Sequence, residues 1–159
     1  MADDRDRRDA DLLQLVTFSI GSEEFGVDIL KVIEIIRTME ITKVPKAPPF
    51  VEGVINLRGT VIPIIGLRRR FGLADKPEDS DTRIIVIAIN GMSVGFVVDS
   101  VSEVLRLQAN TVEPAPPVVA GVDSDYISGV GKLEDRLLIL LDLDKLLSAD
   151  DLELLSAAV

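Results

Sequence analysis

The residue types that perform most protein chemistry are missing from this chain. Its 159 residues include no cysteine and no histidine. These absences exclude disulfides, thiol nucleophiles, Ser-His and Cys-His catalysis, and the commonest ligands of zinc and iron. No Gly-rich phosphate loop of the GxxxxGK[ST] or GxGxxG kind is present to position a nucleotide. We therefore expect no cofactor and no metal, and an enzyme would have to work with carboxylates or a lysine alone.

Arg58 is the charged residue whose position the sequence defines best. Two apolar, β-branched runs flank the Arg58-Gly59 step. Because a glycine at the second loop position takes the positive φ of a tight reversal, the stretch 53–71 predicts a β-hairpin with one cation at its tip. From its position alone, Arg58 is either a solvated turn residue or an interface residue whose planar guanidinium holds a carboxylate.

The charge balance limits the classes of partner. A net charge of −10 disfavours the phosphate backbone of nucleic acid and anionic membrane surfaces. The basic cluster 68–70 is either a solvated helical face or a complement to an acidic patch on a partner. The longest uncharged stretch, 84–98, is shorter than the ~20 apolar residues of a membrane helix. We expect a soluble cytoplasmic protein with a disordered tail over 1–13 and no direct membrane insertion.

Short strands are the elements that must position these charges. Besides the central hairpin, the turn signals predict three more β-hairpins. Their strand pairs are 15–20 and 24–27, 83–89 and 92–98, and 127–133 and 136–141. A capping box at Ser148 predicts a C-terminal helix over 148–159.

A further short helix is predicted after Asp28, which can cap it. Within this helix Val32, Ile33 and Ile36 would share one face, although so many β-branched residues suit a strand equally well. Those residues are either core or one flank of a partner surface.

The two halves of the chain match each other. Residues 26–37 match 95–106 at a constant offset of 69, and Gly53 and Leu67 match Gly129 and Leu143 at an offset of 76. The simplest architecture is mainly β, with two similar units of about five strands, each too small to bury a full core alone and so packed into one body. Closing each sheet into a barrel would hide its edges.

The motifs of this chain resemble those of the CheW family, the coupling proteins of bacterial chemotaxis. The resemblance covers about residues 14–147 and is carried by the runs 25–35, 53–64, 95–101 and 129–141. It implies two SH3-like five-stranded β-barrels packed together, with short helices and a C-terminal helix. It also implies a single domain of two intertwined subdomains, 14–73 and 82–147, without catalytic activity.

The same resemblance implies partners and surfaces. Members of the family join the cytoplasmic hairpin tips of methyl-accepting chemoreceptors to the regulatory domain of the histidine kinase CheA, at receptor arrays on the inner face of the membrane. We expect a monomer in isolation. Arg58 would lie at the receptor surface, paired with and oriented by Glu34. The other receptor-groove candidates are Val54, Ile84, Val86, Val97 and Val104. The kinase-binding candidates are Val32, Ile33 and Ile36.

One position departs from the family pattern. Gly66 stands where relatives usually carry Asp, while Asp142 occupies the equivalent position of the second half, so we expect the first half to lack a local cap. Four alternatives stay open: a fragment of a kinase, an adaptor of a surface-motility or other chemosensory pathway, a small β-barrel that binds oligonucleotides, and a carboxylate enzyme. A chain with five Phe, one Tyr and no Trp offers few surfaces on which bases can stack.

Overall fold

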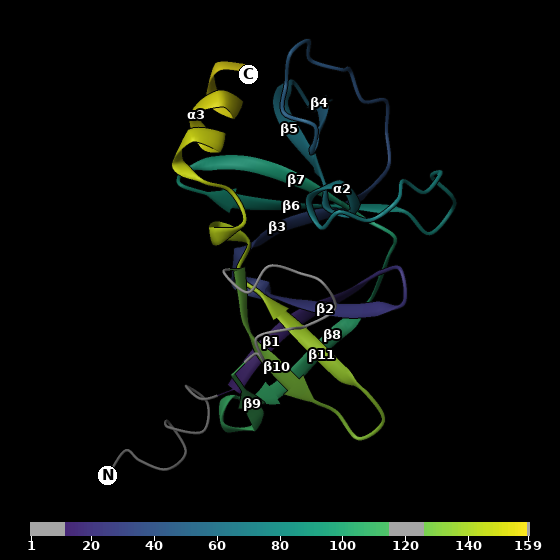
Figure 1. Ribbon diagram of the computed structural model, residues 1–159, viewed down its shortest axis with the longest axis vertical. Helices are drawn as coiled ribbons and strands as arrows, with labels where there is room; N and C mark the ends of the chain where they lie inside the picture. The colour runs from purple at the N-terminus through teal and green to yellow at the C-terminus, as the bar shows by residue number, and fades with distance from the viewer. Residues whose placement is uncertain (1–11, 115–125, 159) are drawn as a thin grey trace.

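The computed structural model describes residues 12–114 and 126–158, which form two β-sheets placed one above the other (Figure 1). The strands of the six-stranded sheet are β1 (Leu12–Ile20), β2 (Glu23–Asp28), β8 (Ser100–Gln108), β9 (Val112–Glu113), β10 (Ile127–Lys132) and β11 (Leu137–Leu141). Those of the five-stranded sheet are β3 (Val32–Arg37), β4 (Val51–Leu57), β5 (Thr60–Gly66), β6 (Arg83–Ile89) and β7 (Met92–Val98). The mainly β architecture is therefore confirmed.

The two sheets exchange strands between the halves of the repeat. The six-stranded sheet has the order β8-β1-β2-β11-β10-β9, and the five-stranded sheet has the order β3-β6-β7-β5-β4. Each sheet thus combines the first hairpin of one half with the later strands of the other. Ranges 14–73 and 82–147 describe the repeat, whereas the sheets cross that boundary. The first strand begins at Leu12, two residues inside the predicted tail, and residues 1–11 lie outside the described part.

Each sheet curls around a small apolar core of its own. In the five-stranded sheet the two edge strands, β3 and β4, approach each other through a short bridge, in which Thr42 and Val54 exchange two backbone hydrogen bonds of 2.8 Å. Gly53 permits this approach, because a Cβ there would lie 2.2 Å from the carbonyl oxygen of Thr42, and its φ is +145°. The buried residues of this core are Ile55, Ile62, Ile64, Ile84 and Val86. Those of the six-stranded sheet are Leu15, Leu138 and Leu140.

A third and larger core joins the sheets. It contains buried side chains from both, among them Phe25 of β2 and Phe96 of β7. The short helices α2 (Leu67–Arg70) and η4 (Leu143–Lys145) and the terminal helix α3 (Ala149–Ala158) add to it. Because α3 is shorter than the ~12 residues that an isolated helix needs, it depends on docking, which buried Leu155 provides. No helix in the described ranges is long and apolar enough to span a membrane.

The capping predictions are confirmed, and one helix prediction is wrong. Ser148 and Asp151 exchange the two 3.0 Å hydrogen bonds of a capping box at the start of α3. Asp28 does cap a turn, accepting from the backbone N–H of Leu30 at 2.9 Å, but that 3₁₀ turn, η1 (Ile29–Lys31), is only three residues long. From Val32 the chain continues as β3 because its β-branched residues favour the strand.

Candidate partner-binding surface

The backbone of the β4–β5 turn fixes Arg58 at a rigid tip. Arg58 and Gly59 have φ of 52° and 89°, which is the geometry of a two-residue type I′ hairpin turn. The side-chain oxygen of Asn56 accepts a 2.8 Å hydrogen bond from the N–H of Gly59 and locks the turn. The Arg58 side chain is 69% exposed. The predicted hairpin with a cation at its tip is confirmed.

Glu34 meets Arg58 across the open side of the five-stranded sheet. Glu34 lies on edge strand β3, and Arg58 follows the opposite edge strand β4. The Nη2 group of Arg58 donates to Oε1 of Glu34, whose side chain is 29% exposed. The predicted pairing is therefore confirmed, and it has a structural role as well, because it links the two ends of the curled sheet. We use the name Arg58 surface for Arg58, Glu34 and the half-buried Val54.

The other receptor candidates divide by burial. Ile84 and Val86 are 0% and 1% exposed and belong to the core of the five-stranded sheet, so they present nothing to a partner and are removed from the candidate surface. Val97 is half-buried against the same core. Val104 is 54% exposed, but it lies on β8 of the other sheet.

The kinase candidates do not share one face. In strand β3 alternate side chains point to opposite sides, so half-buried Val32 and Ile36 pack toward the cores while Ile33 points outward. Ile33 and its outward neighbour Ile35 are 52% and 39% exposed. We call these two residues the β3 outer face. The helical spacing that grouped Val32, Ile33 and Ile36 was wrong for the same reason as the helix itself.

The cluster of three arginines is bound within the molecule. Arg68 donates to the carboxylate of Asp99, and Arg69 forms ion pairs with Asp75 and Glu52. Arg70 donates twice to the carbonyl oxygen of Leu146 and lies over the rings of Phe50 and Tyr126, with its Cζ 5.3 and 5.8 Å from their centroids. Each arginine of the cluster thus has a partner within the molecule, although the Arg69 side chain is still 42% exposed.

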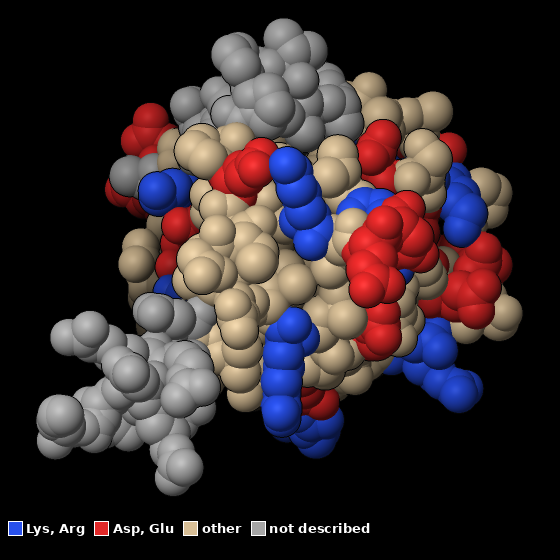
Figure 2. Space-filling view, turned by 90° about the horizontal axis from the view of Figure 1, so that it is seen from below, with Lys and Arg blue, Asp and Glu red and all other residues tan. Residues whose placement is uncertain are grey.

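On the face drawn in Figure 2, the basic side chains of the described residues do not gather into a patch that could bind nucleic acid. Figure 2, a view onto the end of the six-stranded sheet, shows lysine and arginine side chains interspersed with acidic ones. At the β10–β11 hairpin, Arg136 pairs with Glu24 and Glu103, and Lys132 pairs with Glu113. Of the aromatic rings only Phe50 is not buried, at intermediate exposure, so bases have little on which to stack.

Gly66 lacks the cap that Asp142 supplies to the second half, as predicted. No side chain caps α2 at Gly66, whereas the carboxylate of Asp142 accepts a 3.1 Å hydrogen bond from the N–H of Asp144. Glu52 occupies the vacant space: a Cβ on Gly66 would lie 2.3 Å from its Oε1. The residue equivalent to Glu52 in the repeat is Ser128, so each half has one acidic side chain here: Glu52 on β4 in the first half and Asp142, the cap of η4, in the second.

We predict that Gly66→Asp destabilises the protein by about 1–2 kcal/mol, because the new carboxylate displaces Glu52 from Arg69 and repels it. The double variant Glu52→Ser with Gly66→Asp copies the second half and should recover most of that loss. Urea denaturation of the wild type, both single variants and the double variant measures the coupling. Strictly additive losses would contradict the exchange of the two acidic residues.

Asp99 is a largely buried carboxylate whose pKa is shifted by its neighbours. Burial alone would raise the pKa of Asp99, but the hydrogen bonds from Arg68 and the Gly21 N–H, together with the charge of Arg68, outweigh burial and hold that pKa below its ordinary value. In the unfolded chain an aspartate titrates at about 3.9. The ionised folded form therefore contributes its full stabilisation above that pH and loses it as the pH falls through the lower, folded pKa.

We predict that the difference in unfolding free energy between the wild type and Asp99→Asn stays constant above about pH 5 and narrows below about pH 4. Urea denaturation curves at pH steps from 7 to 3 measure this difference. A difference that stays the same down to pH 3 would show that the ionised carboxylate of Asp99 does not stabilise the fold.

Comparisons with known proteins agree on one family. The family model described as a CheW-like domain matches residues 14–151. The chain is similar to the chemotaxis protein CheW of Klebsiella aerogenes, with 42% identity over 141 residues that cover 89% of this chain and 85% of the relative. It is also similar to the chemotaxis protein CheW of Helicobacter pylori, with 36% identity over 140 residues that cover 88% of this chain and 84% of that relative. The crystal structure of the scaffolding protein TtCheW from Thermoanaerobacter tengcongensis superimposes with a TM-score of 0.81 at 39% identity, over 87% of this chain and 90% of that one.

Proposed function

We propose that this chain, which belongs to the CheW family of chemotaxis scaffold proteins, is a non-enzymatic adaptor that joins chemoreceptor tips to the histidine kinase CheA. The observation that carries the proposal is the Arg58 tip. A turn with two positive φ values holds this arginine in place, Glu34 orients it, and yet most of its side chain stays exposed. Any two-residue hairpin turn requires those φ values, so the pairing with Glu34 is the constraint that a solvated turn residue would not need.

The two partners would meet different parts of the five-stranded sheet. The Arg58 surface offers an oriented guanidinium that holds a carboxylate of the receptor hairpin and sets its register. The β3 outer face offers apolar contact area on an edge strand to the regulatory domain of CheA. The adaptor would act in the cytoplasm at receptor arrays, where the two binding equilibria are coupled so that receptor state biases kinase activity.

Co-sedimentation tests the proposal with the full chain. Membranes bearing receptors from the same cell are mixed with the chain, with and without CheA, and then pelleted. We expect the chain to pellet with receptor membranes, and CheA to pellet only when the chain is present. A chain that stays in the supernatant with every receptor and kinase combination from that cell would overturn the adaptor assignment.

A further inference from the structure

The described strands show the chain passing between the two sheets at two short crossings. The first crossing, β2 to β3, contains η1, and the second, β7 to β8, is the single residue Asp99. Each crossing carries a charged residue that binds the short helix following the last strand of the opposite half. Lys31 of the first crossing pairs with Asp144 of η4 at 2.5 Å, and Asp99 of the second pairs with Arg68 of α2.

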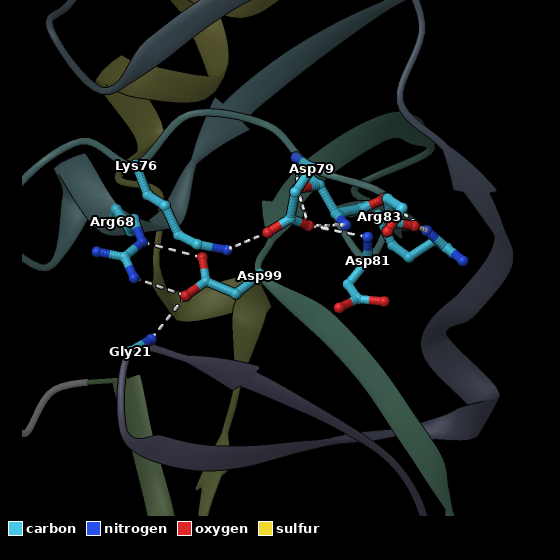
Figure 3. A network of polar contacts seen from close by, with 9 residues as sticks. Gly21, Arg68, Lys76, Asp79, Asp81, Arg83 and Asp99 are labelled. Atoms are coloured by element: carbon cyan, nitrogen blue, oxygen red, sulfur yellow. Dashed lines mark hydrogen bonds and ion pairs between the residues drawn. The ribbon is translucent and has the colours of Figure 1, made fainter.

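The contacts of Asp99 reach three separate elements (Figure 3). Its Oδ1 accepts from Arg68 Nε at 2.9 Å, and its Oδ2 accepts from Arg68 Nη2 at 2.6 Å. Oδ2 also accepts a 2.8 Å hydrogen bond from the N–H of Gly21, in the β1–β2 turn of the six-stranded sheet. The backbone N–H of Asp99 donates to the carbonyl oxygen of Ser19 at 3.0 Å. One carboxylate therefore ties α2 and the five-stranded sheet to the six-stranded sheet.

The two crossings are equivalent in the repeat but differ in charge and strength. Arg68 and Asp144 are related by the offset of 76, whereas Lys31 matches Ser100, the residue after Asp99, at the offset of 69. The cation thus lies on the helix in one pair and on the crossing in the other. The side chains of Arg68 and Asp99 are 23% and 17% exposed and form a bidentate pair, whereas those of Lys31 and Asp144 are 50% and 38% exposed. A bidentate, half-buried pair is directional, and an exposed lysine pair is a weak point contact.

We propose that Arg68, Asp99 and the Gly21 N–H form a clamp that fixes the angle between the two sheets. Arg68 and Asp99 are then positioning residues that hold the five-stranded sheet, which carries both proposed partner surfaces, against the six-stranded sheet. The hydrophobic effect that buries the core between the sheets is non-directional. The clamp adds a directional, bidentate contact to that core. Its role in signalling rests on the proposed adaptor function, because a fixed angle lets a partner on one surface affect the rest of the molecule.

The absence of cysteine allows a direct measurement of the angle. Spin labels at Val61→Cys on β5 and Leu137→Cys on β11, both exposed, report the distance between the sheets. The distance distribution is recorded for the full chain carrying these labels and for the same chain with Asp99→Asn. Asp144→Asn is the matched control, since it removes the carboxylate of the ion pair that Lys31 forms at the other crossing.

We expect a single narrow distance distribution in the parent chain. With Asp99→Asn the distribution should be at least twofold wider or displaced to another mean distance. With Asp144→Asn it should keep the width of the parent. If Asp99→Asn does not fold, Arg68→Lys replaces it, which keeps the charge and loses the planar fork. Unchanged widths in the folded clamp variant, or equal broadening in the control, would overturn the clamp. A parent chain that binds no receptor would refute the proposed function and leave the distance result intact.

Discussion

Phe25→Ala is expected to lower the free energy of unfolding by about 3–5 kcal/mol and to weaken both sheets in one transition. Phe25 is 1% exposed and stands in a row of rings, with centroids 5.7 Å from Phe18 and 5.5 Å from Phe71. Phe71 in turn stacks on Tyr126 at 5.7 Å. Phe25 lies in the six-stranded sheet and Phe71 follows α2 of the five-stranded sheet, so the row crosses the boundary between them.

Urea denaturation followed by circular dichroism measures the loss, and Phe25→Leu serves as the control because it retains much of the buried volume. The conservative variant should lose distinctly less. A second, separate unfolding transition in Phe25→Ala would contradict the conclusion that one shared core joins the sheets. A loss below about 1 kcal/mol would contradict the tight packing of this site.

Arg58→Glu should lower affinity for a receptor fragment at least tenfold, which corresponds to about 1.4 kcal/mol. The substitution removes the guanidinium that we assign to the receptor carboxylate and places a second negative charge beside Glu34. Isothermal titration calorimetry with a receptor hairpin fragment measures the change. Lys132→Glu makes the same charge change on an exposed side chain of the other sheet and should leave the affinity within about twofold of the wild type.

A charge exchange separates the two roles of Arg58. The double variant Glu34→Arg with Arg58→Glu restores an ion pair between β3 and the hairpin tip. Because the pair is largely exposed, each single change should alter stability by less than about 1 kcal/mol, and the exchange should recover it. Receptor affinity should stay low, since the tip now carries a carboxylate. Recovered affinity would mean that Arg58 acts only by closing the sheet.

The sequence was sufficient to predict the hairpins but not to predict that residues 32–37 form strand β3. Arg58-Gly59 and Asn90-Gly91 both adopt the positive φ values that their two-residue turns require, so local chemistry determined them. For 32–37 the local preferences for helix and strand were nearly balanced. Pairing with β6 decided the outcome, and that contact is not visible in the local sequence.

Side-chain environments were predicted less well than strands. Ile84 and Val86 were chosen for a surface because they are apolar, but a strand buried on both faces has the same composition. The partners of the arginine cluster could not be predicted from the local sequence, because Asp99 and Leu146 are 31 and 76 residues from the arginines they bind. Gly66 was recognised as an exception, but its explanation, Glu52, lies on a neighbouring strand.

The most direct test of the adaptor assignment is the control of kinase activity by receptors. CheA autophosphorylation is measured on receptor-bearing membranes with no adaptor, with this chain, and with its Arg58→Glu variant, each with and without attractant. We predict that receptor control of CheA appears only with the wild-type chain, and that Lys132→Glu behaves like the wild type. Equal receptor control without the chain, or with Arg58→Glu at the same concentration, would contradict the account.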